Sequence, residues 1–155
     1  MNGKVRAFNG DMGMAMSIFK DMVGKVRFVF ADPPYMITQA RYDKNKFSYD
    51  KMWGIIQKML APDGVVAVTC SLTAAVEIMG AAPAGWYRYD LVWHKTTPTG
   101  FLNAKKAPLR NHELILIFSP MPLRLPLDWK SREYANDLLD HYSTFPTSLI
   151  LFLSR

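Results

Sequence analysis

The chain has 155 residues, half of them hydrophobic and 21% charged, which is the composition of one globular domain and not of a disordered or collagen-like chain. Cys70 is its single cysteine, which excludes a disulfide scaffold and a cysteine-based zinc site and fits a reducing cytosol. The 19 lysine and arginine residues outnumber the 13 acidic ones, and the net charge of +6 is consistent with a polyanionic partner such as nucleic acid.

Strands and helices are predicted in alternation along the first part of the chain. Apolar runs rich in β-branched and aromatic residues predict the strands, and apolar residues at helical spacing predict the helices. Asp11 and Ser71 stand where N-caps of the first and last helices would stand. In chain order the predicted elements are a strand at 4–8, a helix at 12–22, a strand at 26–31, a helix at 49–60, a strand at 64–69, a helix at 72–79, and strands at 87–93 and 113–119.

The predicted strands at 26–31 and 64–69 are apolar throughout, which is typical of strands covered on both faces by helices. The alternation of such strands with helices favours an open α/β sheet. We therefore predict one domain over residues 1–155, with a mainly parallel, Rossmann-like sheet and an antiparallel hairpin on its C-terminal side.

From about residue 97 onward, the regular apolar patterns of the first part of the sequence become rarer. Residues 97–112 are basic and lack apolar periodicity, so we expect a substantial loop there. Residues 120–126 contain three prolines and exclude a regular element, residues 129–142 can form a short helix, and residues 145–152 are apolar again. No apolar run approaches the roughly 18 residues that span a bilayer, so we expect no membrane partner.

The sharpest feature is Asp32-Pro33-Pro34-Tyr35, which comes directly after the strongest predicted strand. In open α/β sheets, ligands bind beyond the carboxyl ends of strands. Two prolines fix the backbone, so the Asp32 carboxylate and the Pro33 carbonyl become acceptors aimed at one spot beside a tyrosine ring. This arrangement suits a planar ligand with an amino group, such as an extruded nucleobase. The alternative is a rigid turn that ends the strand.

This motif resembles the catalytic motif of the amino-group DNA methyltransferases, which methylate N6 of adenine or N4 of cytosine. Further segments are similar to the circularly permuted (β-class) members of that family, in the family's order. These segments are FNGD at 8–11, LVWHK at 91–95, PTGFLNAKK at 98–106, PLR at 108–110, HELILIF at 112–118 and FPTS at 145–148. The resemblance covers nearly the whole chain.

The resemblance implies a role for each residue of the motif. Asp32 and the carbonyl of Pro33 would accept hydrogen bonds from the target amino group and align its nitrogen with the methyl group of S-adenosylmethionine. Pro34 completes the catalytic motif, and Tyr35 would stack on the flipped base. Asp11 and Asp32 match positions near the cofactor. Catalysis of this kind rests on orientation and electrostatics and needs no covalent enzyme intermediate.

The resemblance also implies that a basic loop from position 95 to position 112 faces double-stranded DNA. Its expected DNA contacts, mainly to phosphates, are Lys95, Lys105, Lys106, Arg110 and His112. The alternative for each of these residues is a solvated basic loop. His112 and Glu113 can also form a structural pair at the start of a strand. A target-recognition segment is expected at about residues 120–142, after a catalytic region at residues 1–119.

One part of the family pattern is missing. In the permuted class a glycine-rich turn that lets the backbone approach the cofactor follows later in the chain. This sequence ends at Arg155 without that turn, and Gly10 with Gly13 does not replace it. We therefore expect a partial methyltransferase sheet, an incomplete S-adenosylmethionine site and weak or no cofactor binding by the isolated chain. A decayed enzyme, a split enzyme completed by a complementary chain, and a homo-oligomer are the alternatives.

The resemblance implies a cytoplasmic protein of bacterial or phage type that methylates DNA site-specifically, as restriction-modification enzymes do, without a metal. Adenine N6 is favoured as the target because aspartate heads the motif, where serine is commoner in the cytosine-N4 members. An inactive remnant that holds DNA or another subunit is the alternative function. An RNA or protein methyltransferase with related chemistry is a third.

Overall fold

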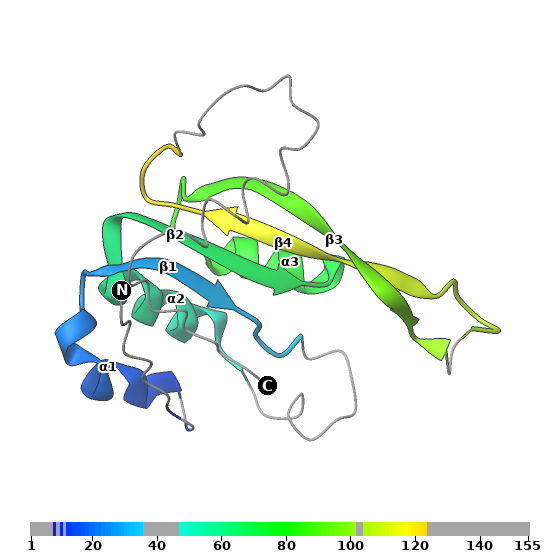
Figure 1. Ribbon diagram of the computed structural model, residues 1–155, viewed down its shortest axis with the longest axis horizontal. Helices are drawn as coiled ribbons and strands as arrows, with labels where there is room; N and C mark the ends of the chain where they lie inside the picture. The colour runs from blue at the N-terminus through cyan, green and yellow to red at the C-terminus, as the bar shows by residue number, and fades with distance from the viewer. Residues whose placement is uncertain (1–7, 9, 11, 36–46, 102–103, 124–155) are drawn as a thin grey trace.

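The computed structural model describes residues 8, 10, 12–35, 47–101 and 104–123. In this part of the chain, a four-stranded sheet is accompanied by two longer helices and three short helical segments (Figure 1). In chain order they are η1 (Met12–Met14), α1 (Ala15–Ile18), η2 (Lys20–Met22), β1 (Val26–Ala31), α2 (Tyr49–Met59), β2 (Leu60–Cys70), α3 (Leu72–Ala81), β3 (Tyr87–Thr99) and β4 (Arg110–Phe118).

The sheet has the strand order β1-β2-β4-β3, so the last strand lies between the second and the third. β1 and β2 are parallel, whereas β4 is antiparallel to both β2 and β3. Three of the described strands therefore point in one direction and β4 runs against them (Figure 1). This confirms the predicted α/β fold with a C-terminal antiparallel hairpin, and the sheet is mixed, with one parallel and two antiparallel pairings among the described strands.

Both longer helices begin at a serine that caps the first turn. The hydroxyl of Ser48 accepts a hydrogen bond from the amide of Lys51 at 3.2 Å, and that of Ser71 accepts one from the amide of Ala74 at 3.3 Å. Each bond satisfies an amide that has no partner within the helix. The predicted cap at Ser71 is confirmed, and α2 agrees with its predicted span to within one residue.

The main core lies between the sheet and the helices, around the side chain of Trp53 in α2. Its ring centroid is 4.7 Å from that of Phe118 in β4, and its indole nitrogen donates a 3.1 Å hydrogen bond to the carbonyl of Ile78 in α3. One side chain thus joins α2 to both α3 and the sheet. The indole N–H is satisfied although Trp53 is almost fully buried, as buried polar groups usually are.

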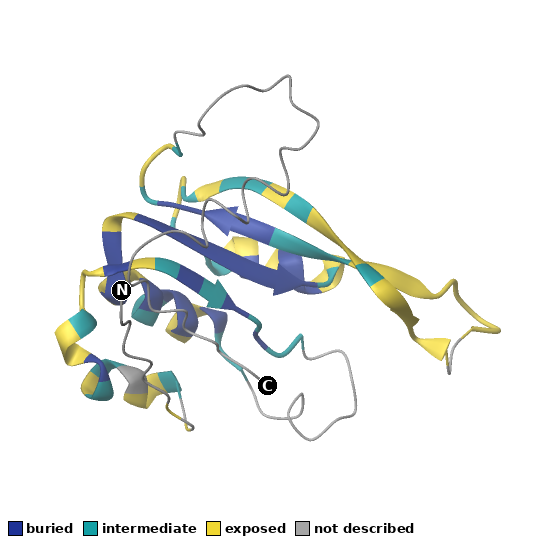
Figure 2. Ribbon diagram, in the orientation of Figure 1, coloured by how far each residue is buried: buried dark blue, intermediate teal, exposed yellow. Residues whose placement is uncertain are grey.

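The central strand β2 is buried on both faces (Figure 2). Val66 and Val68 belong to the main core, while Val65 and Ala67 form a smaller cluster with Ile117 on the opposite face. This division follows from the alternation of side chains along a strand. It explains why the sequence of β2 reads as a continuous apolar run.

The predicted helix at 12–22 is wrong as a continuous element, because the segment divides into η1, α1 and η2. The hydroxyl of Ser17 donates to the carbonyl of Met14 at 2.8 Å, so a side chain takes a carbonyl that a backbone amide would bond in a longer helix. Gly13 lowers the helix propensity of the same turn. Phe19 still packs into the core, as the apolar pattern of this segment requires.

The loop predicted before the last strand is shorter than expected. β3 continues to Thr99 and β4 begins at Arg110, which leaves residues 100–109 as the turn. The ladder still pairs His94 with His112, because backbone pairing does not need the apolar side chains that the sequence pattern detects. The part of the hairpin from this pair outward, residues 94–101 and 104–112, projects from the molecule and is mostly exposed (Figure 2). We call it the β3–β4 arm.

Several sequence predictions fall outside the described residues. They concern the strand at 4–8, of which only Phe8 is described and is not in a strand, the helix at 129–142, the apolar segment at 145–152, and most of the target-recognition segment at 120–142.

Candidate functional site

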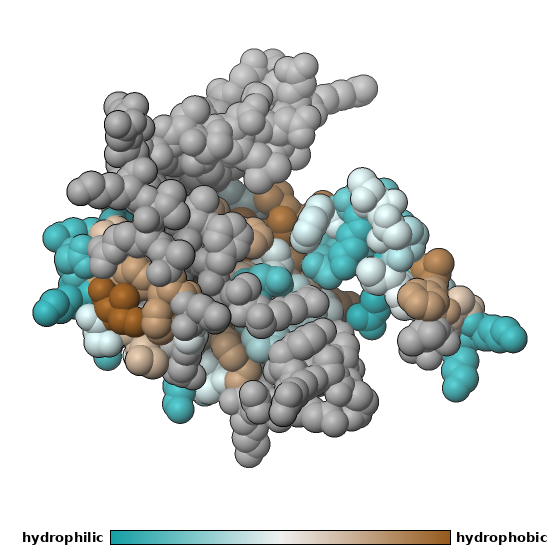
Figure 3. All heavy atoms as spheres, turned by 60° about the horizontal axis from the view of Figure 1, so that its bottom comes forward, coloured by the Kyte–Doolittle hydropathy of each residue, from teal (hydrophilic) through white to brown (hydrophobic). Residues whose placement is uncertain are grey.

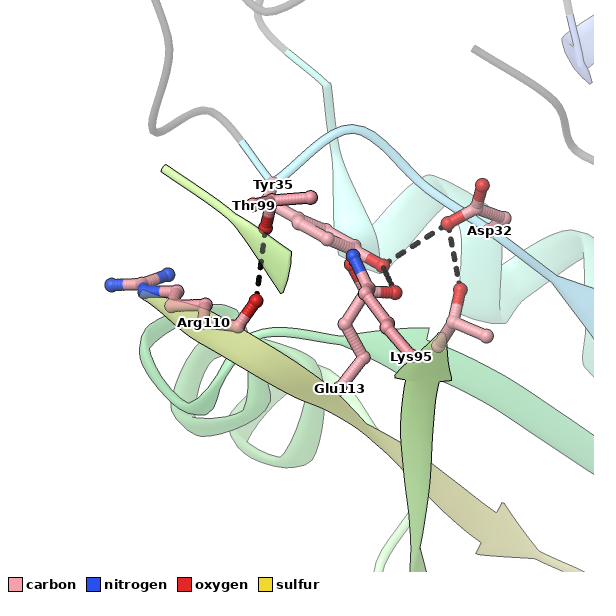
Figure 4. A network of polar contacts seen from close by, with 7 residues as sticks. Asp32, Tyr35, Lys95, Thr99, Arg110 and Glu113 are labelled. Carbon is pink, nitrogen blue, oxygen red and sulfur yellow. Dashed lines mark hydrogen bonds and ion pairs between the residues drawn. The ribbon is translucent and has the colours of Figure 1, made fainter. Parts of the chain in front are cut away.

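The Asp-Pro-Pro-Tyr motif at 32–35 follows β1 directly, at the carboxyl edge of the sheet. β2 is parallel to β1 and ends at the same edge, which brings Thr69 beside the motif. β4 runs in the opposite direction, so its first half reaches this edge with Glu113, and β3 adds Lys95. Polar side chains from three strands therefore meet the motif in one network (Figure 4).

The Asp32 carboxylate accepts hydrogen bonds from two neighbouring hydroxyls at its Oδ1 atom. Oγ1 of Thr69 lies 2.7 Å away and the hydroxyl of Tyr35 lies 3.1 Å away. Thr69 is only 1% exposed, so packing limits its side chain to the observed orientation. The donor in the rigid strand β2 thus holds the carboxylate in one direction, which a group that must meet a ligand in a single geometry requires.

The hydroxyl of Tyr35 lies between two carboxylates. It is 3.1 Å from Oδ1 of Asp32 and 3.5 Å from Oε2 of Glu113. Burial raises the pKa of the Tyr35 phenol far above its usual range, and the charges of Asp32 and Glu113 add to this rise, which a hydrogen bond with Thr69 partly offsets. Tyr35 is therefore a protonated hydrogen-bond donor at neutral pH.

The two prolines are fixed from the side of the helices. Pro33 is fully buried, and the carbonyl of Pro34 accepts a 3.1 Å hydrogen bond from the hydroxyl of Tyr49, the first residue of α2. Tyr49 is itself buried. The motif is thus attached to α2 as well as to the end of β1.

Lys95 forms an ion pair with Glu113 inside this network. The two side chains are 21% and 16% exposed, so the pair is largely shielded from solvent. The sequence placed Lys95 on a DNA-facing loop, but the structure places it in β3 with its ammonium group on Glu113. The difference arises because β3 extends further than its apolar pattern indicates.

The other predicted DNA contacts lie on the β3–β4 arm. Lys105 and Lys106 are exposed in the turn, and Arg110 and His112 are exposed at the start of β4. The arm carries hydrophilic and hydrophobic side chains together (Figure 3), among them Phe101, which is 73% exposed. These four basic residues lie on the arm with their side chains exposed, whereas Lys95, at the base of the arm in β3, has its ammonium group paired with Glu113.

Sequence reasoning missed three residues of the site: Thr69, Tyr49 and Glu113 as a partner of Tyr35. Thr69 had a signal, since it is a polar residue that closes an apolar strand at the ligand-binding edge. Glu113 opens an apolar strand and was assigned only as a neighbour of His112. Tyr49 gave no signal, because its contact depends on how α2 packs beside the motif.

The residues needed for the cofactor are described only in part. Asp11 lies outside the described residues, and the Asp32 carboxylate is engaged by Thr69 and Tyr35. No glycine follows the carboxyl end of β1 or β2 in the described residues, so they offer no backbone cradle of the kind S-adenosylmethionine binding would use. The described part therefore offers acceptor groups at this edge of the sheet and no glycine turn beside them.

The described residues lack two further features. No group of three or more histidine, cysteine or acidic side chains that could hold a metal ion occurs among them. None of their helices is long and apolar enough to cross a membrane.

The chain has the fold of a methyltransferase, as comparison with solved structures shows. The structure of the DNA methyltransferase M1.HpyAVI matches 94% of this chain and 77% of its own length, with a TM-score of 0.64 and 15% sequence identity. The M1.HpyAVI–SAM complex matches 80% of this chain, with a TM-score of 0.56 and 15% identity, and the match spans 62% of that protein. No protein-family model and no curated protein matches the sequence.

Proposed function

We propose that this chain acts in the methylation of double-stranded DNA at N6 of adenine, with S-adenosylmethionine as the methyl donor. The observation that carries the proposal is the Asp-Pro-Pro-Tyr motif, whose Asp32 carboxylate is held by Thr69 and Tyr35 at the carboxyl edge of a methyltransferase sheet. The proposal extends to a cytoplasmic location and to a site-specific activity, as the resemblance of the motif implies.

The chemistry follows from the acceptors at the site. Asp32 and the carbonyl of Pro33 would accept hydrogen bonds from the two N–H groups of the target amine, which directs the lone pair of its nitrogen away from the ring. S-adenosylmethionine, when bound, would supply an electrophilic methyl group and leave as a neutral thioether, and the methylated nitrogen would release one proton to solvent. The chain contributes orientation and electrostatic stabilisation and forms no covalent bond with the base. Tyr35 would stack on the base after its extrusion from the duplex.

The DNA backbone would be held by the β3–β4 arm. Lys105, Lys106, Arg110 and His112 are exposed along it, and phosphate contacts from such residues position a protein without reading sequence. Lys95 does not belong to this set, because its charge is offset by Glu113 in the site.

The cofactor side of the site needs residues beyond the described ones. We propose that the remainder of the chain, a complementary chain or a second copy of this chain supplies the backbone cradle for S-adenosylmethionine. The match spans 62% of the protein in the M1.HpyAVI–SAM complex and 77% of M1.HpyAVI.

Methyl transfer from radiolabelled S-adenosylmethionine to unmethylated DNA tests the proposal, with digestion of the DNA to identify the modified base. We expect N6-methyladenine, and we expect its formation to stop in Asp32→Ala. Glu77→Ala is the matched control, because Glu77 is an exposed acid in α3 and is not among the site residues named above. Salt-sensitive DNA binding without any methyl transfer would instead support an inactive DNA-binding module.

A further inference from the structure

The Tyr35 hydroxyl has one proton and two carboxylates within reach. Hydroxyl hydrogen bonds are usually 2.5–3.0 Å long, so the 3.1 Å contact to Asp32 is the better bond and the 3.5 Å contact to Glu113 is the weaker one. A phenol donates one full hydrogen bond at a time. In the structure Tyr35 therefore donates mainly to Asp32, with Glu113 as a second acceptor beside it (Figure 4).

The proposed function needs the same carboxylate for a different donor. Oδ1 of Asp32 already accepts from Thr69 and Tyr35, and one carboxylate oxygen accepts about two hydrogen bonds, so a target amine that binds at Oδ1 would have to replace one of these two hydroxyls. Thr69 is buried in β2 and cannot leave without disturbing the sheet. Tyr35 is half-buried and lies beyond the strand end, so it is the donor that can move. Stacking on the base would also take its ring away from an edge-on contact with Asp32.

The second acceptor is held in place. Glu113 forms an ion pair with Lys95, and both side chains are largely shielded from solvent. The pair fixes the position of Glu113, and the ammonium group offsets a second negative charge close to Asp32. Glu113 is therefore a fixed carboxylate that can accept a hydrogen bond from Tyr35, close to the Asp32 carboxylate that accepts it now.

We propose that Glu113, held by Lys95, is a positioning residue that takes over the hydrogen bond of Tyr35 when the target amine binds Asp32. This inference rests on the proposed function. Without the base, the phenol donates to Asp32. With the base, the amine N–H donates to Asp32 and the phenol donates to Glu113. The proton of Tyr35 stays on its oxygen throughout, and its ring is oriented by a hydrogen bond in both states.

The variants are chosen so that the fold is preserved. Lys95→Met/Glu113→Met removes the acceptor together with its counter-charge, because removal of one partner alone would leave a shielded charge without its pair. Glu113→Gln keeps an acceptor oxygen that can still bind the ammonium group of Lys95, so the shielded charge retains a polar partner. Arg27→Met/Asp63→Met is the matched control, since this ion pair of 2.7 Å is exposed and lies outside the network.

Single-turnover methyl transfer in the wild-type and Tyr35→Phe backgrounds tests the transfer of the hydrogen bond. We expect the double methionine variant to slow transfer by roughly 10- to 100-fold with DNA affinity changed less than about twofold. In the Tyr35→Phe background the double methionine variant should slow methyl transfer by less than about twofold, because the hydroxyl that donates to Glu113 is absent. Equal losses in both backgrounds would overturn the proposal and make the pair a structural one.

A second readout does not depend on methyl transfer. In Glu113→Gln the Tyr35 phenol loses a neighbouring negative charge and keeps the ammonium group of Lys95 nearby, so its pKa should fall. We expect ultraviolet difference spectra to show a tyrosine that ionises at lower pH than in the wild type and that is absent from Glu113→Gln/Tyr35→Phe. An unchanged titration overturns the Tyr35–Glu113 contact. A changed titration without methyl transfer in any variant overturns the proposed function, and the transfer of the hydrogen bond with it.

Discussion

Oγ1 of Thr69 donates a 2.7 Å hydrogen bond to Oδ1 of Asp32, although the two residues are 37 positions apart in the sequence. The bond exists because β1 and β2 are parallel and in register, with Ala31 opposite Val68. The next residue on each strand, Asp32 after Ala31 and Thr69 after Val68, makes the bond. Strand register therefore decides the direction of the carboxylate that the proposed reaction uses.

Replacement of Thr69 with valine tests this bond. We expect methyl transfer to slow by about tenfold, because Asp32 loses an orienting donor, and the free energy of unfolding to fall by about 1 kcal/mol. Single-turnover rates and urea unfolding measure the two effects. Thr69→Ser keeps the hydroxyl and should recover most of the rate. A loss in the serine variant as large as in the valine variant would attribute the effect to packing.

The elements nearest the site were predictable from the sequence because their causes are local. β1 is an apolar run of β-branched and aromatic residues and matches its predicted bounds, and the cap of α3 at Ser71 is set within one turn. The motif at 32–35 was placed correctly at the strand end, since it follows β1 directly.

The network around the motif was not predictable, because its members meet through tertiary register. Glu113 reaches Tyr35 because β4 runs antiparallel beside β2. Tyr49 reaches Pro34 because α2 packs beside the motif. The assignment of Lys95 to a loop failed for a related reason. Polar residues can also pair in a β-ladder, so the apolar pattern of the sequence does not predict where β3 ends.

Trp53 is the side chain whose removal should cost the fold most. It is 2% exposed, packs on Phe118 and Trp86, and hydrogen-bonds to Ile78. We expect Trp53→Ala to lower the free energy of unfolding by about 3–5 kcal/mol, as a cavity of this size usually does. Urea unfolding followed by circular dichroism measures the change.

The matched control is Trp93→Ala, because Trp93 is 50% exposed on β3. Its effect on the free energy of unfolding should stay below about 1 kcal/mol. If the two alanine variants were destabilised to the same extent, the core would not be centred on Trp53.

Cys70 should be unreactive in the folded protein. The residue is fully buried at the end of β2, and this burial, with smaller contributions from the carboxylates of Glu113 and Asp90, raises the pKa of its thiol to about 12. Because the thiolate is the reactive form, iodoacetamide should label Cys70 only after unfolding in urea. Mass spectrometry measures the labelling. Ser17→Cys, at an exposed position, should be labelled in the folded state and serves as the control.

The same shift predicts how stability depends on pH. Between about pH 9 and about pH 12 the thiol of the unfolded chain loses its proton while the folded thiol keeps it. The folded state then binds more protons, so the free energy of unfolding falls as the pH rises through this window. In Cys70→Ala the fall should be smaller, and urea titrations at matched pH values compare the two proteins. An identical decline in both would contradict the raised pKa.

Lys105 and Lys106 should carry a measurable share of DNA binding, because they are exposed together in the turn of the β3–β4 arm. In Lys105→Ala/Lys106→Ala we expect the slope of log affinity against log salt to fall by about two units, since each phosphate contact contributes roughly 0.9. The weakening should be alike for duplexes of different sequence, because phosphate contacts do not read bases. Fluorescence anisotropy between about 50 and 200 mM salt measures both effects.

Lys51→Ala/Lys58→Ala removes the same charge from exposed positions of α2 and should leave the slope within about half a unit. A fall of equal size in this control would mean that binding follows net charge and not the arm.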